Sequence, residues 1–267
     1  MEEVCNTIAK TAVISPKAEI GKNVSIGDFC VIGDGVKIGD GTKLYNGVTV
    51  IGNTTIGKNN TIFPYAVLGT IPQDLKYHGE EVFLEIGDNN IIREHCMFNP
   101  GTEGGGKKTI IGNNNLFMAF VHIAHDCIIG NHCILANNAT LGGHVEVGDY
   151  VNLGGLSAVH QFVKIGDAVM VGGGSMLTQD APPYCILEGN RAVIRGLNRH
   201  RLRLLFSHED VDYINALYKR LFSKEGLLSD LTKQELQKDP ENIFVKKICN
   251  FIMNSQRGIP VKRGDNE

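Results

Sequence analysis

The sequence of 267 residues contains no tryptophan, only 7% aromatic residues and no long apolar run. A helix that crosses a bilayer needs about 20 consecutive apolar residues, and no segment approaches that length. The N-terminal residues MEEVCNTIAK are acidic and lack the apolar stretch of an export signal. A formal net charge of −3 disfavours general nucleic-acid binding, which requires a strongly basic face. These absences predict a cytoplasmic protein with no membrane span and no nucleic-acid partner.

Cysteine occurs without a pairing pattern. The seven residues are odd in number, scattered along the chain and contain no C-x-x-C pair; they are Cys5, Cys30, Cys96, Cys127, Cys133, Cys185 and Cys249. Such a distribution favours reduced thiols in a cytosol over a disulfide framework.

What the sequence does contain is a period of six. A large apolar residue recurs at every sixth position from Ile8 to Leu68, again from Ile86 to Phe98, and from Ile111 to Leu177. No helix has this period, and it is typical of hexapeptide repeats, which build a parallel β-helix. Three repeats form one coil of about 18 residues, and coils stack at the strand spacing of about 4.8 Å. A single coil cannot bury its own apolar face, so stacking must stabilise the solenoid.

Glycine often follows the periodic residue, at positions 21, 27, 33, 39, 57, 87, 112, 130, 148, 166 and 172. We expect these glycines, and the Asn or Asp residues near them, to tolerate the positive φ angles that tight corners often require.

The repeats are interrupted twice, at 69–83 and at 100–109, and loops expelled from a solenoid commonly carry its function. We expect Pro182 and Pro183 to end the strands. The remainder is predicted to be helical: Ser207 is a candidate cap for one helix, and residues 231–237 and 242–253 indicate two more. The prediction is a mainly β protein with a β-helix domain at 1–188 and a small α-helical domain at 189–267.

Four histidines interrupt the repeats between 122 and 160. Residue His125 projects onto 143 and 161 in the next two coils, and His144 and His160 each lie one residue away. Together with His122, these imidazoles are predicted to share one corner of the prism. Isolated turn histidines such as His95 and His132 are usually structural.

Two kinds of chemistry fit such a cluster. One is a zinc site, since H-x-x-H with further histidines resembles the three-histidine site of γ-class carbonic anhydrases, which use this fold. The other is general-base catalysis with polar substrate contacts. In either case Asp126 could fix the tautomer of His125. Spacing alone leaves both open.

Longer motifs make the chain resemble the UDP-N-acetylglucosamine 3-O-acyltransferases of lipid A biosynthesis. The matching segments, in family order, are PQDLKYHGE (72–80), IGDNNIIRE (86–94), NPGTEGGGKKTIIG (99–112), HIAHDCIIGN (122–131), GGHVEV (142–147), AVHQF (158–162), DAPPY (180–184) and GNRAVIRGLN (189–198). The resemblance implies a left-handed β-helix, a homotrimer with sites shared between subunits, and no metal or cofactor beyond the phosphopantetheine of the donor.

The resemblance also implies roles for individual residues. His125 would be the general base, oriented by Asp126, and the backbone N–H of Gly143 would donate to the oxyanion. Gly173 would leave the acyl groove open for a longer chain. Substrate contacts are implied for Gln73, Asp74, Lys76, His122, His144, His160, Gln161, Asn198, Arg201 and Arg203.

One segment departs from the family pattern. At the start of the uridine-binding helix, the usual acidic residue is replaced by His200 and the paired arginines are absent, although Asn198 is retained. Arg201 or Arg203 could take the place of the pair. The basic residues of 191–203 would also attract an acidic acyl carrier protein.

The sequence thus predicts an enzyme that transfers an (R)-3-hydroxyacyl group from acyl carrier protein to the 3-position of UDP-N-acetylglucosamine or its 3-amino analogue. The enzymatic alternatives are a γ-type carbonic anhydrase or a small-molecule acetyltransferase on the same fold. The non-enzymatic alternative is a scaffold that binds the nucleotide sugar or the carrier protein without catalysis.

Overall fold

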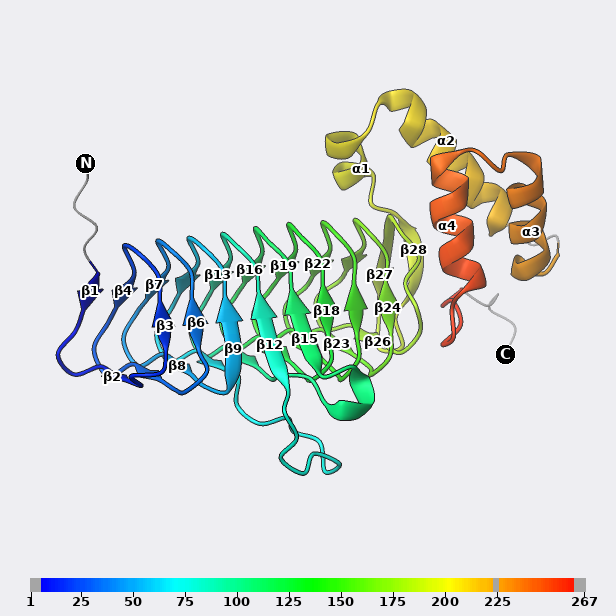
Figure 1. Ribbon diagram of the computed structural model, residues 1–267. Coiled ribbons are helices and arrows are strands. Elements are labelled where there is room, and N and C mark those ends of the chain that lie inside the picture. Colours follow the sequence, from blue (N-terminus) through cyan, green and yellow to red (C-terminus); the bar gives the residue numbers. More distant parts are fainter. Residues whose placement is uncertain (1–5, 223–225, 262–267) are drawn as a thin grey trace.

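The computed structural model describes residues 6–222 and 226–261, and most of it is a left-handed parallel β-helix (Figure 1). Its short strands stack into three sheets, which we call A, B and C. Where no loop intervenes, residues 18 apart lie in register, as His122 does with Thr140. The six-residue period therefore predicted the fold.

In the described residues each sheet collects every third strand as far as β26, and the last two strands both extend sheet A. Sheet A has eleven strands: β1 (Thr7–Ile8), β4 (Ser25–Ile26), β7 (Lys43–Leu44), β10 (Thr61–Ile62), β13 (Ile91–Ile92), β16 (Leu116–Phe117), β19 (Ile134–Leu135), β22 (Asn152–Leu153), β25 (Met170–Val171), β27 (Cys185–Glu188) and β28 (Val193–Leu197). Sheet B has nine: β2 (Val13–Ile14), β5 (Val31–Ile32), β8 (Thr49–Val50), β11 (Val67–Leu68), β14 (Met97–Phe98), β17 (His122–Ile123), β20 (Thr140–Leu141), β23 (Ala158–Val159) and β26 (Met176–Leu177). Sheet C has eight: β3 (Glu19–Ile20), β6 (Lys37–Ile38), β9 (Asn53–Ile56), β12 (Phe83–Ile86), β15 (Lys108–Ile111), β18 (Ile128–Ile129), β21 (Glu146–Val147) and β24 (Lys164–Ile165).

The periodic residues form the core. In a strand successive side chains point to opposite faces, so in each two-residue strand the second residue points inward. Phe98 and Phe117 are fully buried and pack edge to face, with ring centroids 4.9 Å apart. Stacked coils thus bury the apolar surface that one coil leaves open.

The expectation of positive φ at the corners was wrong for these glycines and is confirmed for nearby asparagines. None of the eleven glycines named above has a positive φ. Glycine is needed at these positions because the next coil leaves no room for a side chain: a Cβ on Gly39 would lie 2.6 Å from the backbone of Gly57. Positive φ falls instead two residues after the glycine, on residues such as Asn59 and His132.

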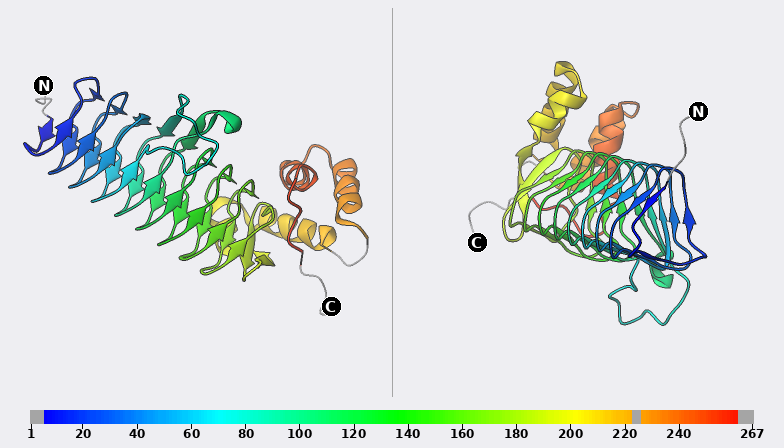
Figure 2. Two further views of the ribbon diagram at one scale, coloured as in Figure 1. Left: turned by 90° about the horizontal axis from the view of Figure 1, so that it is seen from below. Right: turned by 90° about the vertical axis from the view of Figure 1, so that its left-hand side faces the viewer.

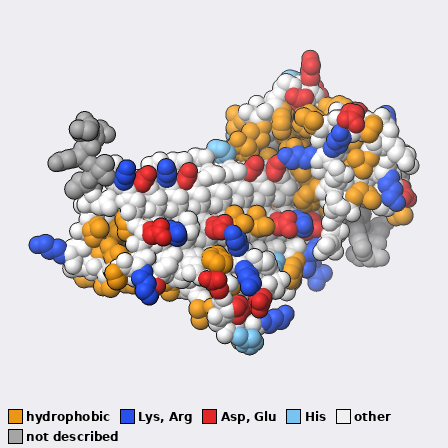
Figure 3. Space-filling model, in the orientation of Figure 1, with side chains coloured by type: hydrophobic (Ala, Val, Ile, Leu, Met, Phe, Trp, Pro, Cys, Tyr) orange, Lys and Arg blue, Asp and Glu red, His pale blue; other side chains and the backbone are white. Residues whose placement is uncertain are grey.

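The outward faces of sheets B and C differ in charge. Sheet C carries ion pairs between neighbouring coils, including Lys37–Glu19 and Lys164–Glu146, both 2.9 Å (Figure 3). Such exposed pairs stabilise little, but they mark a face that remains in water. The outward residues of sheet B include no Lys, Arg, Asp or Glu; they are Val13, Val31, Thr49, Val67, Met97, His122, Thr140, Ala158 and Met176.

Strands continue beyond Pro182 and Pro183, contrary to expectation. Strand β27 pairs with β25 and extends sheet A, and β28 returns antiparallel to it. Because Pro183 lies in the turn before β27, its missing N–H removes no ladder hydrogen bond.

After β28 the described part of the chain forms four helices: α1 (Arg199–Leu205), α2 (His208–Leu221), α3 (Leu228–Lys238) and α4 (Ile243–Met253) (Figures 1 and 2). The three predicted helices are confirmed as α2, α3 and α4. Ser207 caps α2 through a reciprocal capping box with Asp210. No helix in the described part of the chain is long and apolar enough to cross a membrane.

The six cysteines of the described segments are all buried and free, while Cys5 lies outside these segments. Burial raises the pKa of Cys96, Cys127 and Cys133 to about 12. Their thiols are therefore protonated at neutral pH and serve as small apolar side chains.

Candidate active site

Two loops leave the β-helix at the corner where sheet B passes into sheet C, which we call the B–C corner. Loop 1 (residues 69–82) joins β11 to β12, and loop 2 (residues 99–107) joins β14 to β15 and contains the short helix η1 (Glu103–Gly105). Both loops lie side by side on the lower edge of the solenoid (Figures 1 and 2). The loops therefore overhang the corner that carries His125, His144 and His160.

At this corner His125 is paired with Asp126. The Nδ1 atom of His125 lies 2.8 Å from Oδ2 of Asp126. The Asp126 side chain is fully buried, and 13% of the His125 side chain is exposed. Burial by itself raises the pKa of Asp126, but hydrogen bonds from His125 and Thr102 outweigh it and hold that pKa below its usual value. Asp126 is thus an anion at neutral pH, which fixes the proton of His125 on Nδ1 and leaves Nε2 free to accept.

The ring of His144 closes one side of the pair. It meets His125 edge to face at 5.0 Å, and it stacks on Phe162 at 4.3 Å with nearly parallel planes. Its Nε2 lies 3.8 Å from Oδ2 of Asp126. Burial lowers the pKa of His144 although Asp126 opposes this, so His144 is neutral at neutral pH and not ion-paired.

Gly143 lies one coil beyond His125, against its ring. The residue is buried, and its backbone N–H has no hydrogen-bond partner among the described residues. The ladder bonds belong to its neighbours, since Gly142 donates to Val159 and His144 donates to His125. A backbone donor beside the imidazole therefore remains available to a ligand.

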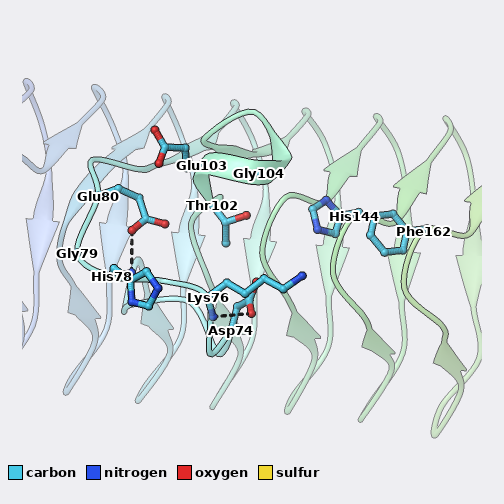
Figure 4. A pocket seen from close by; sticks show the side chains of 10 residues that line it. All are labelled: Asp74, Lys76, His78, Gly79, Glu80, Thr102, Glu103, Gly104, His144 and Phe162. Atoms are coloured by element: carbon cyan, nitrogen blue, oxygen red, sulfur yellow. Dashed lines mark hydrogen bonds between the residues drawn. The ribbon is translucent and has the colours of Figure 1, made fainter.

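A cavity of about 680 Å³ opens between the loops and the corner (Figure 4). Its lining comes from loop 1, loop 2 and the corner itself: Asp74, Lys76, His78, Gly79, Glu80, Thr102, Glu103, Gly104, His144 and Phe162. The backbone N–H of Lys76 donates to Asp74 Oδ1 at 3.0 Å, and the Lys76 side chain extends toward His144. A cationic group thus faces the histidines across the cavity.

The remaining predicted residues of this corner take other positions. His122 points outward from β17, where burial lowers its pKa and the nearby His125 lowers it further. The Nδ1 of His160 lies 3.1 Å from the carbonyl oxygen of Gln161. Gln73 donates from Nε2 to the sulfur of Met97 at 3.1 Å. All four histidines are at or beside one corner, but of these four described rings only those of His125 and His144 are in contact with each other.

Other predicted residues lie far from His125 within the same chain. Gly173 is at the corner between sheets A and B, where a Cβ would lie 3.3 Å from the Gly155 carbonyl. Asn198 is 4% exposed; it caps α1 and donates to Ala168. Arg201 and Arg203 belong to α1, and the Arg201 guanidinium lies 6.0 Å from the ring centroid of Tyr150, at the corner between sheets C and A.

A metal ion fits this cluster poorly. The ligand atoms of His125, Asp126 and His144 lie within 4.8 Å of one another. However, Oδ2 of Asp126 already accepts from His125 and from Thr102 at 2.6 Å. A metal there would have to displace both hydrogen bonds, and the set is not the three-histidine site considered from the sequence.

The sequence did not single out Thr102 or Phe162, although both contact the predicted residues. Two features of the sequence could have identified them. Thr102 lies in the expelled loop 2, and Phe162 follows His144 by 18 residues, the length of one coil.

The chain resembles known proteins over almost its whole length. A family model described as Udp N-acetylglucosamine O-acyltransferase, domain 2, matches residues 180–260, and one described as bacterial transferase hexapeptide (six repeats) matches 17–52, 35–70 and 108–143. The acyl-[acyl-carrier-protein]–UDP-N-acetylglucosamine O-acyltransferase of Helicobacter pylori strain Shi470 is 62% identical, with 97% of this chain and 96% of that protein covered.

Solved structures agree with this. A crystal structure of a UDP-N-acetylglucosamine acyltransferase has a TM-score of 0.95 at 62% identity, covering 96% of this chain and 99% of that one. The Campylobacter jejuni UDP-N-acetylglucosamine acyltransferase has a TM-score of 0.92 at 44% identity, covering 96% and 100%. These relatives do not favour the carbonic anhydrase, small-molecule acetyltransferase or non-catalytic alternatives.

Proposed function

The chain belongs to the UDP-N-acetylglucosamine O-acyltransferase family, and from this premise we propose that it transfers an (R)-3-hydroxyacyl group from acyl carrier protein to UDP-N-acetylglucosamine. The acceptor atom is the 3-hydroxyl of the sugar, or the nitrogen of its 3-amino analogue. The reaction is the first step of lipid A biosynthesis, and we place it in the cytoplasm, where carrier protein and nucleotide sugar are available.

One observation carries the proposal: His125 lies between an anionic Asp126 and the backbone N–H of Gly143, which has no hydrogen-bond partner among the described residues. Asp126 accepts from Nδ1–H, so Nε2 takes the proton from the sugar hydroxyl as its oxygen attacks the thioester carbonyl. The carbonyl oxygen becomes an oxyanion that accepts a hydrogen bond from Gly143. When the intermediate collapses, the C–S bond breaks and His125 returns the proton to the phosphopantetheine sulfur.

The cavity under the two loops suits the nucleotide sugar. Lys76 offers a positive charge for the diphosphate, and Asp74 holds the turn from which Lys76 projects. His144 is neutral, so its ring can donate to or accept from sugar hydroxyls. We assign His122, His160, Gln161 and Gln73 to the rim of the same site.

A homotrimer would bring the distant residues to this site. Within one chain Arg201 and Arg203 lie on α1, on the side of the solenoid opposite the two loops (Figure 1), so a neighbouring subunit must supply them if they contact the uridine. Asn198 fixes the turn from which they project. The uncharged outward face of sheet B is suited to burial against another subunit, because a charged group there would lose its hydration.

Two measurements test the trimer. Light scattering should give three times the chain mass of 29.1 kDa. Co-expressed H125N and R203A chains should recover transfer that neither variant shows alone, because a mixed trimer contains sites with both residues intact. A monomer, or no recovery in mixed trimers, would contradict shared sites.

The carrier protein is proposed to approach near α1 and α2. A cavity of about 590 Å³ between β28 and α2 is lined by Arg195, Arg199 and Lys219 among others. Acyl carrier proteins are acidic, so positive charge there speeds their association and makes it sensitive to salt.

The decisive experiment measures transfer from hydroxyacyl carrier proteins of several chain lengths to UDP-N-acetylglucosamine and to the 3-amino analogue, with and without a chelator. Transfer that the chelator leaves unchanged supports the proposed reaction and identifies donor and acceptor. Zinc in the purified protein, with no transfer to either sugar, would overturn it in favour of a metal site.

A further inference from the structure

We propose that Thr102 of loop 2 is a positioning residue for the acyl transfer, which acts by holding the Asp126 carboxylate against His125. The inference rests on the proposed function, because it concerns the same base. It assigns a task to a loop that the hexapeptide repeat does not require.

Thr102 binds both oxygens of the carboxylate. Its backbone N–H donates to Oδ1 of Asp126 at 2.8 Å, and its hydroxyl donates to Oδ2 at 2.6 Å. Oδ2 is also the oxygen that lies 2.8 Å from Nδ1 of His125. Two contacts from one residue fix both the position and the rotation of the carboxylate, so the lone pairs of Oδ2 remain aimed at His125.

The far end of loop 2 is tied to the same residue. The backbone N–H of Asp126 donates to the Thr109 hydroxyl at 2.8 Å, just after the loop enters β15. Between these points Gly105 passes so close that a Cβ there would clash with the Asp126 carboxylate. The loop therefore encloses Asp126, whose side chain has no exposed surface.

The Thr102 hydroxyl is also placed where it could accept a hydrogen bond as a helix cap. Thr102 is the N-cap residue of η1, a position where a threonine hydroxyl ordinarily accepts from the backbone of the first turn. It makes no such bond here. The hydroxyl is directed to Asp126 instead, at the expense of the cap.

The chemical consequence concerns His125. A buried carboxylate that lacks partners is driven toward its neutral form, and a neutral Asp126 could donate to His125 and select the wrong tautomer. With Thr102 in place, Asp126 is an acceptor only. Nδ1 then carries the proton, and Nε2 presents its lone pair to the substrate in every turnover.

The test compares T102V, which keeps the shape and backbone N–H but removes the hydroxyl, with T102S, which retains it. The control is T42V, because Thr42 is also buried and donates to Gly57 at 2.9 Å, at a different corner. Values of kcat and KM are measured with one hydroxyacyl carrier protein and UDP-N-acetylglucosamine. In parallel, the imidazole ¹⁵N spectrum of each protein without substrate reports the His125 tautomer, assigned with H125N.

We expect T102V to lower kcat roughly 10- to 100-fold, the range found when an outer partner that orients a histidine is lost in metal sites, with KM within about twofold. T102S should recover kcat to within about threefold of the unaltered enzyme. T42V should lower the melting temperature as T102V does but leave kcat unchanged. The Nδ1–H tautomer of His125 should dominate in the unaltered protein and T102S, and lose dominance in T102V.

Equal kcat in T102V and the unaltered enzyme, or an unchanged His125 tautomer in T102V, would overturn the positioning role. If the unaltered protein transfers no acyl group, the proposed function fails, yet the tautomer comparison still decides whether Thr102 sets the protonation of His125. The two failures are thus distinguishable.

Discussion

The backbone of Gly143 lies directly against the imidazole of His125: a Cβ on Gly143 would fall 2.5 Å from Cε1 and 2.6 Å from Nε2 of that ring. The register of the coils creates this contact, because Gly143 occupies the position of His125 one coil later. Glycine is required for the close approach, not for an unusual φ. The base and the proposed oxyanion donor are therefore placed by the same repeat that builds the fold.

Replacing Gly143 with alanine should abolish most transfer while the fold survives. The added methyl group must displace the His125 ring, and both the base and the oxyanion site lose their geometry, so kcat should fall at least 10²–10³-fold. The control is G39A, because a Cβ on Gly39 would also clash, 2.6 Å from the backbone of Gly57, but at a different corner. Circular dichroism and steady-state kinetics check this, and a G143A enzyme with near-normal kcat would refute the contact's importance.

The substitution H125N should remove the general base and lower kcat by roughly 10²–10⁴-fold, with little change in KM. The matched control is H132N. His132 lies at a different corner with a φ of +57°, and its ring stacks on Tyr150. Asn114, at the same position one coil earlier, has a similar φ, so asparagine fits this backbone conformation. If H132N lost as much activity as H125N, the effect would reflect the stability of the solenoid and not catalysis.

The substitution G173M should shift the donor preference to shorter acyl chains. Gly173 is exposed, and its Cβ position contacts only the Gly155 backbone, so a long side chain can occupy the space beyond it. The ratio of kcat/KM for long and short hydroxyacyl carrier proteins should fall at least tenfold, while the short donor retains most of its activity as an internal control. An unchanged ratio would place the end of the acyl groove elsewhere.

The protein should lose stability as the pH falls through the ordinary histidine value of 6.5. Burial lowers the pKa of His122 and of His144, so below pH 6.5 the unfolded chain binds protons that these folded residues do not. The free energy of unfolding therefore declines with falling pH in this window.

Denaturant midpoints at pH 7.5, 6.5 and 5.5, at one protein concentration, measure this decline. In the double variant H122N/H144N the dependence should be flatter. An equally steep dependence in the double variant would assign it to other groups.

Much of the fold followed from the sequence, because the period of six is a direct consequence of one inward side chain per strand. Ser207 predicted the start of α2 for a similar reason, since a cap is a local interaction. The corner glycines were misinterpreted because conformational freedom and close packing both select glycine. The expectation that Pro182 and Pro183 end the strands was wrong, because a proline in a turn removes no hydrogen bond between strands.

The sequence by itself determined the solenoid and the register of its coils. In a fixed repeat the separation along the sequence determines which residues stack, so it also placed His125, position 143 and position 161 above one another. Only the tertiary structure decided what the two expelled loops do. Loop 2 returns to the corner and fastens Asp126 through Thr102, and loop 1 brings Lys76 toward His144. These contacts join segments with no periodic relation, and their geometry depends on packing between side chains that no repeat specifies.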